Sequence, residues 1–249
     1  DIGDRVITTG VVAVLPGVFG TQYLYMVDSM NTASSSETPG VQVYLFNKDF
    51  PTVSLGDRIE VTGELSEISG ELRLKAKEKS DIRVLGAEQI PAPSVFDIGN
   101  TGEAVEGWLI EISGEVTELK STHMYVDDGT DEIKVYFKKG TGIDKKMLHI
   151  GDIVRVVGIM SQTKTGYHLL PRDQFDITKT GVSEAFVASV ESHDTTEEGQ
   201  VAETYLTATA GGITSLLVGL FAKMHGSTAM KYAKRFGGIA AVYIKNKRA

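Results

Sequence analysis

The segment LGDRIEVTG, residues 55–63, has a near-copy in IGDIVRVVG, residues 150–158. Each begins with an aliphatic residue and Gly-Asp, continues with alternating polar and β-branched residues, and ends at a glycine. Gly-Asp is typical of a tight turn, in which the aspartate side chain stabilises a backbone shape that glycine adopts readily. The alternation that follows predicts a half-buried strand. The sequence therefore predicts one β-rich unit that occurs twice.

The repeat extends to the alternating runs around each copy. Around the first copy these runs are 5–15, 22–28, 41–46 and 64–79. Around the second they are 108–119, 123–128, 133–137 and 160–171. Gly10 and Gly114 interrupt the first run of each unit, where glycine often marks a bulge or a bend at a barrel corner. We therefore expect a mainly β protein with two tandem five-stranded Greek-key barrels of the oligonucleotide/oligosaccharide-binding (OB) type.

Proline, charge and hydropathy divide the chain into further segments. Pro91 and Pro93 indicate a stiff linker between the barrels. Because the chain begins at Asp1 without a methionine or an apolar leader, we expect a processed or truncated form of a longer protein. The expected parts are a first barrel at 1–89, a proline-containing linker at 90–103, a second barrel at 104–180, an acidic tether at 181–203, a helical transmembrane segment at 204–225 and a basic cytoplasmic tail at 226–249.

The carboxyl-terminal charges favour a membrane anchor. Residues 204–222 are 19 residues without a charge, roughly the length that crosses a bilayer. Residues 180–204 carry six acidic side chains and no Lys or Arg, whereas residues 205–249 carry seven basic ones and no Asp or Glu. Basic residues after the span predict a cytoplasmic tail and extracellular barrels. The alternative is a buried helix in a small third domain.

Composition and motifs give no sign of catalysis. The chain has no cysteine, which excludes disulfides and thiolate metal sites. Its five histidines are scattered, and no GxSxG, HExxH, P-loop or dinucleotide motif occurs. The acidic run DDGTDE, residues 127–132, lacks the spacing of a calcium loop and is explained by a hairpin turn at Asp128-Gly129. We expect no catalytic residues, no metal and no cofactor.

Cations and aromatic residues alternate in places that suit nucleic acid. In ELRLKAKEK, residues 71–79, period two predicts one row of cations on a strand whose apolar residues face the core. Aromatic residues on the second and third runs of each unit could stack on bases, although period two does not say which face is outward. The alternatives are solvated lysines and aromatic core residues. The predicted nucleic-acid-binding residues are Phe19, Tyr23, Tyr25, Tyr44, Arg73, Lys75, Lys77, Tyr125, Lys134, Tyr136 and Lys138.

The first unit resembles a known group over about residues 5–85. That group shares a PGxFG-like loop, an Asp after the second strand, a G(V/I)QVY strand and a GDxVxVxGxxxExxGxxxL segment. The matching residues are Pro16, Gly17, Phe19, Gly20, Asp28, Gly40, Gln42, Val43, Gly56, Asp57, Gly63, Glu67 and Gly70. The unit is similar to OB-fold domains found beside extracellular bacterial nucleases and in lamin-tail-domain surface proteins. The second unit is similar only in outline, because it lacks the PGxFG loop and the Glu before Ser-Gly.

The resemblance implies a nucleic-acid-binding accessory module, and the residue pattern points the same way. We therefore expect a non-catalytic, membrane-anchored surface protein that binds single-stranded DNA, for extracellular DNA capture or beside a nuclease or uptake system. The net charge of −8 argues against indiscriminate binding of polyanions and predicts a modest affinity that salt weakens. The alternative is a structural or protein-interaction component of a cell-envelope complex, with an envelope protein as partner.

Overall fold

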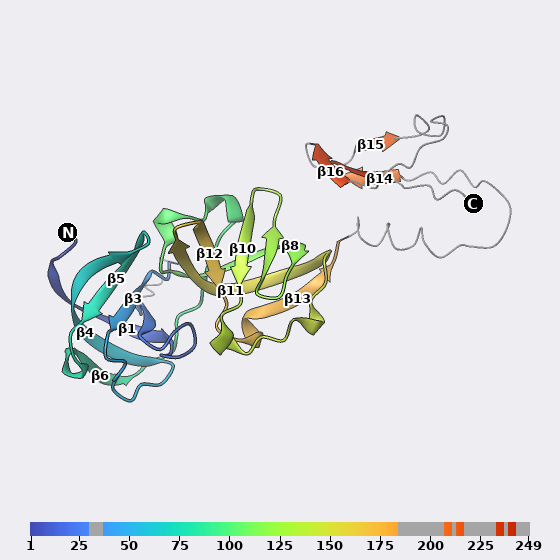
Figure 1. The fold of residues 1–249 in the computed structure, drawn as a ribbon. Helices are drawn as coiled ribbons and strands as arrows, with labels where there is room; N and C mark the ends of the chain where they lie inside the picture. The colour runs from blue at the N-terminus through green and yellow to red at the C-terminus, as the bar shows by residue number, and fades with distance from the viewer. Residues whose placement is uncertain (30–36, 184–206, 211–212, 217–232, 237–238, 243–249) are drawn as a thin grey trace. The chain divides into compact units, whose positions relative to one another are not determined.

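In a computed structural model of the chain, the two Gly-Asp segments begin the two longest strands of a pair of β-barrels (Figure 1). The structure describes residues 1–29, 37–183, 207–210, 213–216, 233–236 and 239–242. The chain divides into two compact units, Asp1–Ser183 and Glu184–Ala249, and both barrels belong to the first. The prediction of two five-stranded barrels in a mainly β protein is confirmed.

The first barrel closes through its first and fourth strands. Its strands are β1 (Arg5–Val14), β2 (Tyr23–Val27), β3 (Gly40–Leu45), β4 (Asp57–Ile68), β5 (Glu71–Ala76) and β6 (Ile82–Ala87). The order β1-β2-β3-β5-β4 returns to β1, and β3 and β5 are parallel, as in an OB-type Greek-key barrel. The extra strand β6 was not predicted. It pairs with Asp57–Val61 of β4, an edge that the shorter β5 leaves uncovered.

The second barrel repeats this topology. Its strands are β8 (Leu109–Leu119), β9 (His123–Asp127), β10 (Glu132–Tyr136), β11 (Asp152–Thr163), β12 (Gly166–Leu170) and β13 (Ile177–Val182). The expected linker at 90–103 is more than a spacer. It contains β7 (Ser94–Val95), which pairs with β8, and the 3₁₀ turn η2 (Ile98–Asn100), whose Ile98 is buried in the core of the second barrel. The remaining 3₁₀ turns are η1 (Lys79–Asp81), η3 (Glu103–Val105), η4 (Lys139–Thr141), η5 (Lys145–Met147) and η6 (Gln174–Asp176).

The two Gly-Asp turns have the same geometry. Gly56 has φ +84° and Gly151 has φ +89°, a left-handed conformation that favours glycine. The Asp57 carboxylate accepts a hydrogen bond from the backbone N–H of Ser54 at 2.7 Å, and that of Asp152 accepts from His149 at 2.8 Å. Each aspartate therefore fastens the entry to its long strand, as the repeated sequence predicts.

Gly10 and Gly114 lie where the first strand of each barrel passes from one neighbour to the other. A Cβ atom at Gly10 would lie 2.9 Å from the Val27 carbonyl oxygen, and one at Gly114 would lie 2.6 Å from that of Asp127. A register shift follows in each strand, between Val12 and Val14 in β1 and between Val116 and Glu118 in β8. The close backbone contact at these corners explains the glycines.

The two barrels pack against each other through a shared apolar cluster and through close backbone contacts. The cluster joins Ala13, Val14, Phe19, Tyr25 and Val27 of the first barrel to Leu109, Ile159 and Leu170 of the second. A Cβ atom at Gly107 would lie 2.4 Å from the Gly40 carbonyl oxygen, and one at Gly140 would lie 2.3 Å from that of Gly17. Leu109 N–H also donates to the Thr38 carbonyl at 3.1 Å. Backbone meets backbone at these points, which leaves no room for larger residues.

The predicted carboxyl-terminal parts fall largely outside the described residues. The acidic tether at 181–203 is described only up to Ser183. Within the expected transmembrane segment, the described residues form two short antiparallel strands, β14 (Thr207–Ala210) and β15 (Ile213–Leu216), and the predicted tail contains β16 (Ala233–Phe236) and β17 (Ile239–Val242). In the part of the chain that the structure describes, no helix is long and apolar enough to cross a membrane. The anchor at 204–225 stays a prediction.

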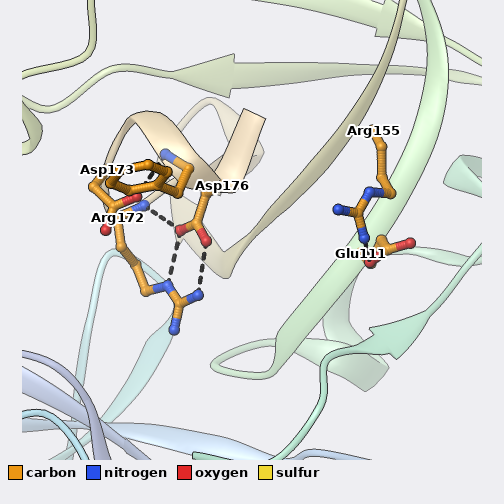
Figure 2. A network of polar contacts seen from close by, with 6 residues as sticks. Glu111, Arg155, Arg172, Asp173 and Asp176 are labelled. Carbon is orange, nitrogen blue, oxygen red and sulfur yellow. Dashed lines mark hydrogen bonds and ion pairs between the residues drawn. The ribbon is translucent and has the colours of Figure 1, made fainter. Parts of the chain in front are cut away.

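A buried ion pair fixes the turn between β12 and β13 (Figure 2). The Asp176 carboxylate accepts hydrogen bonds from the backbone N–H of Arg172 at 2.7 Å and from its Nε and Nη2 at 2.8 and 2.7 Å. The Asp176 side chain is only 7% exposed. Figure 2 also shows a more exposed ion pair between β11 and β8, in which Arg155 Nη1 lies 3.0 Å from Glu111 Oε2.

We predict that Asp176→Ala lowers the free energy of unfolding by about 3 kcal/mol, because it leaves the largely buried Arg172 guanidinium without its partner. Glu111→Ala, which removes one exposed bond to Arg155, is the matched control and should cost about 0.5 kcal/mol. Urea denaturation of the two variants checks this, and equal losses would contradict a special role of the Asp176 pair.

Candidate nucleic-acid interface

Strand register places the polar residues of β2 and β3 on the outside of the first barrel. Leu24 and Val43 point into the core, so their neighbours in sequence point outward. Tyr23 is paired with Tyr44 across the two strands, and Tyr25 with Gln42. The aromatic pairs that period two left ambiguous are therefore outward-facing with respect to their own barrel.

Strand β5 continues this face, but its cation row is shorter than predicted. Arg73 lies beside Gln42, and Lys75 lies beside Tyr44. Lys77 follows the end of the strand and is exposed, and Leu72, expected in the core, is 42% exposed.

The Arg73 guanidinium lies 4.3 Å from the centre of the Tyr44 ring, and its Nε donates to Ser66 Oγ at 3.1 Å. Arg73 and Tyr44 thus form one planar cation–π pair on the surface.

The second barrel covers part of this face, which corrects two of the predicted binding residues. Tyr25 is 1% exposed and Phe19 is 7% exposed, because both belong to the apolar cluster between the barrels. Their rings are 5.8 Å apart in an edge-to-face contact, and Tyr23 contacts Tyr25 in the same way at 6.0 Å. Phe19 and Tyr25 therefore present no ring to solvent and serve the contact between the barrels.

Glu71 is the residue at this junction that sequence reasoning missed. Period two places it outward beside Arg73, yet it is 4% exposed, because the second barrel covers it. Its carboxylate accepts hydrogen bonds from the Tyr25 hydroxyl, from Gln42 Nε2 at 3.3 Å and from Ser161 Oγ at 2.7 Å. Ser161 comes from β11 of the second barrel, so the network joins the two barrels.

The network also affects proton affinities. Burial raises the pKa of Glu71 above its usual 4.5, against the hydrogen bonds that stabilise its ionised form. Burial raises the pKa of Tyr25 well above 10, and the neighbouring Glu71 carboxylate adds to the effect. No sequence signal reveals this, because the burial comes from a barrel that lies about 90 residues away along the chain.

Beside the Glu71 network, the barrels leave an open cleft, which we call the inter-barrel cleft, with a volume of about 360 Å³. The first barrel supplies aromatic, amide and charged side chains, and the second barrel supplies Lys138, three residues of β11 and Leu170 of β12. The lining includes Tyr23, Gln42, Tyr44, Arg73, Lys138 and Gln162. Burial lowers the pKa of Lys138, while the Glu71 carboxylate opposes that shift.

The corresponding face of the second barrel carries alternating rings and cations. Tyr125 of β9 is paired with Lys134 of β10, and Lys134 lies beside His168 of β12. Lys134 Nζ lies 5.3 Å from the centre of the Tyr125 ring. We call this surface the aromatic–cation row, and its members are His123, Tyr125, Lys134, Tyr136, Lys138 and His168. All six side chains are partly exposed.

Contacts along the row connect it to the inter-barrel cleft. Tyr136 stacks on His168 with ring centres 6.2 Å apart, and Lys138 Nζ lies 5.5 Å from the Tyr136 ring. Lys138 is also a wall of the cleft. Burial lowers the pKa of His168, and the nearby charges of Lys134 and Lys138 lower it further. The structure thus brings four predicted residues, Tyr125, Lys134, Tyr136 and Lys138, into one row, and adds two histidines that sequence reasoning did not select.

No protein-family model matches the sequence, and no curated protein matches it. Solved structures with a partial likeness include the p204 HINb domain, at 12% identity over 68% of this chain and 94% of that chain, with a TM-score of 0.36. The tetrameric p202 HIN2 is 12% identical over 73% of this chain and 97% of that chain, with a TM-score of 0.33. The wild-type single-stranded DNA binding protein from Thermus aquaticus is 13% identical over 81% of this chain and 98% of that chain, with a TM-score of 0.22. The assignment of the fold rests on the strand order of the two barrels.

We predict that Glu71 makes the stability of the chain fall as pH rises. Its pKa is higher in the folded than in the unfolded chain, so its contribution is fully present below pH 4.5 and is lost as pH rises through the folded pKa. Glu71→Gln lacks this ionisation. The wild type should therefore lose stability relative to the variant as pH rises from 4.5 through the folded pKa of Glu71, as measured by urea denaturation. A difference between the two proteins that does not change with pH would contradict the prediction.

Proposed function

We propose that this protein binds single-stranded nucleic acid, with single-stranded DNA as the leading ligand, and that it does so without catalysis. One observation carries the proposal: the aromatic–cation row places lysines directly beside partly exposed rings along one face of the second barrel. Rings can stack on bases, and lysines can neutralise the phosphates between them. A double helix hides its base faces, so such a surface suits a single strand.

The first barrel supports the same proposal at a second place. The Arg73–Tyr44 pair and the exposed Lys75 are outward on β3 and β5. The apolar contact between the barrels holds their two faces in a fixed arrangement. A strand bound at one face therefore meets the second face at a high effective concentration. This explains how a chain with a net charge of −8 gains affinity from local rows of cations.

The proposal includes a setting for this binding. The uncharged segment at 204–222, with acidic residues before it and basic residues after it, supports a membrane anchor that holds the barrels outside the cell. The motifs that the first barrel shares with nuclease-associated and lamin-tail OB domains support a role in capturing extracellular DNA beside a nuclease or an uptake system. In this setting the barrels hold the strand and a partner processes it.

The binding surface can be tested by fluorescence anisotropy of a labelled DNA strand of about 15 nucleotides, titrated with the full chain. We expect saturable binding that weakens steeply between about 50 and 200 mM salt. Tyr125→Ala should lose about 1–3 kcal/mol of binding free energy through lost stacking. Lys134→Glu should weaken binding and flatten the salt dependence.

Two control variants separate the row from general effects. Lys79→Glu changes an exposed lysine on η1 and should leave affinity within about twofold. Phe175→Ala removes a ring that is 91% exposed but lies outside the row, and it should have no effect. If Tyr125→Ala binds as the wild type does, the row is not the interface. If no strand binds even at low salt, the alternative of a structural component of an envelope complex replaces the proposal.

The anchor can be tested in cells by deleting residues 204–225 from the full chain. We expect the complete protein to sediment with membranes and to resist extraction at alkaline pH, and the deletion variant to be released. Protease added to intact cells should remove the barrels if they lie outside. A full chain that remains in the soluble fraction would rule out the anchor without affecting the proposal for DNA binding.

A further inference from the structure

We infer that the inter-barrel cleft binds one nucleotide, with its base against the Arg73–Tyr44 pair, a donor group of the base on Gln42 and its phosphate at Lys138. The nucleotide is either one residue of a bound strand, in which case the inference rests on the proposed function, or a free mononucleotide. The cleft exists only because the second barrel packs on the first, since Lys138 comes from the second barrel and Arg73, Tyr44 and Gln42 come from the first. Its volume of about 360 Å³ lies within the range of small-molecule sites.

The first argument is the fixed orientation of the Gln42 amide. Gln42 is 5% exposed and lines the cleft. Its Nε2 donates to the Tyr25 hydroxyl at 3.0 Å and to the Glu71 carboxylate at 3.3 Å. When Glu71 is ionised, its carboxylate accepts hydrogen bonds only, so the nitrogen of the Gln42 amide faces it. The Oε1 of Gln42 then accepts from no donor in the part of the chain that the structure describes.

Gln42 Oε1 has no protein donor among the described residues and is not sealed off from solvent, so a ligand that brings an N–H group can take the place of water on it. The Watson–Crick edges of the bases carry such donors, and the exocyclic amine of adenine is one of them. The Glu71 network therefore does more than join the barrels. It holds the Gln42 side chain so that its acceptor is available to a base.

The second argument is the pair of cations in the cleft. Among the described residues, neither Arg73 nor Lys138 lies within an ion-pair distance of a carboxylate. Arg73 Nε donates to Ser66 Oγ, and the two terminal nitrogens of the guanidinium can donate to a ligand. Lys138 is half-buried, and its ammonium has the ring of Tyr136 as its neighbour. The Arg73 guanidinium lies over the Tyr44 ring, and guanidinium planes stack on bases, so this pair suits a planar base. Lys138 adds a second positive charge for the phosphate joined to that base.

The test compares small ligands on the full chain by isothermal titration calorimetry. The probes are deoxyadenosine 5′-phosphate, purine deoxyriboside 5′-phosphate, which lacks the exocyclic amine, and deoxyribose 5-phosphate, which lacks the base. We expect deoxyadenosine 5′-phosphate to bind best and each of the other two to bind about tenfold more weakly. Equal affinities for all three ligands would overturn the inference.

Matched variants locate the binding. Arg73→Gln and Lys138→Gln should each weaken deoxyadenosine 5′-phosphate binding about tenfold. Arg83→Gln, which changes an exposed arginine on β6 outside the cleft, should change it by less than about twofold. Equal effects of Arg73→Gln and Arg83→Gln would overturn the inference, because a general loss of charge would then explain both.

A further arm distinguishes a strand from a free nucleotide and separates this inference from the proposed function. Oligonucleotides with one abasic position, moved along the strand, should lose affinity most at a single position, and Arg73→Gln should remove that dependence. A strand that binds without any such dependence, together with no mononucleotide binding, overturns the cleft and leaves the proposed function intact. Mononucleotide binding without strand binding supports the cleft and overturns the strand proposal.

Discussion

The packing of the second barrel on the outer face of β2 determines the rest of the molecule described here. Tyr25 and Glu71 point away from the core of their own barrel and are buried at the contact with the second barrel. Burying a carboxylate is unfavourable unless hydrogen bonds compensate, and Tyr25, Gln42 and Ser161 provide them. Because Ser161 belongs to the other barrel, this polar contact requires a specific arrangement of the two barrels, which an apolar cluster alone would specify less strongly.

The packing of the barrels leaves two equivalent outer faces, β2-β3-β5 of the first barrel and β9-β10-β12 of the second, exposed to different extents. The first barrel keeps only part of its outer face open, as a cleft whose far wall is the second barrel. The second barrel keeps its whole row from Tyr125 to His168 partly exposed. Lys138 belongs to both surfaces, since it lines the cleft and lies over Tyr136. A strand on the row would therefore lead toward the cleft at this lysine.

The sequence predicted the barrels well because the signals for them are local. Alternation gave the strands, and the Gly-Asp turns recur with the same φ and the same hydrogen bond. Period two fixes which residues share a face, but not what covers that face, so Tyr25 was expected as a stacking residue and lies between the barrels instead. Phe19, expected to stack from the loop before β2, lies in the same apolar cluster. Glu71 was missed for the same reason, and Leu72 was placed in the core by an alternation that the strand follows only from Arg73 onward. His168 joins the row through a parallel pairing with β10, a contact that no local pattern contains.

The repeat shows which positions the barrel needs and which it leaves free. Both copies keep the positive-φ glycine, the aspartate that follows it and the glycine at the strand corner, because these fix the backbone. The outward positions differ: the cross-strand sequence Tyr25–Gln42–Arg73 in the first barrel corresponds to Tyr125–Lys134–His168 in the second. Replacing Gln42 by a lysine in the first barrel would place a buried cation against Glu71, whereas Lys134 is partly exposed beside a ring. The covered copy therefore holds an amide that can pair with both a carboxylate and a base, and the open copy holds the cation that suits a phosphate.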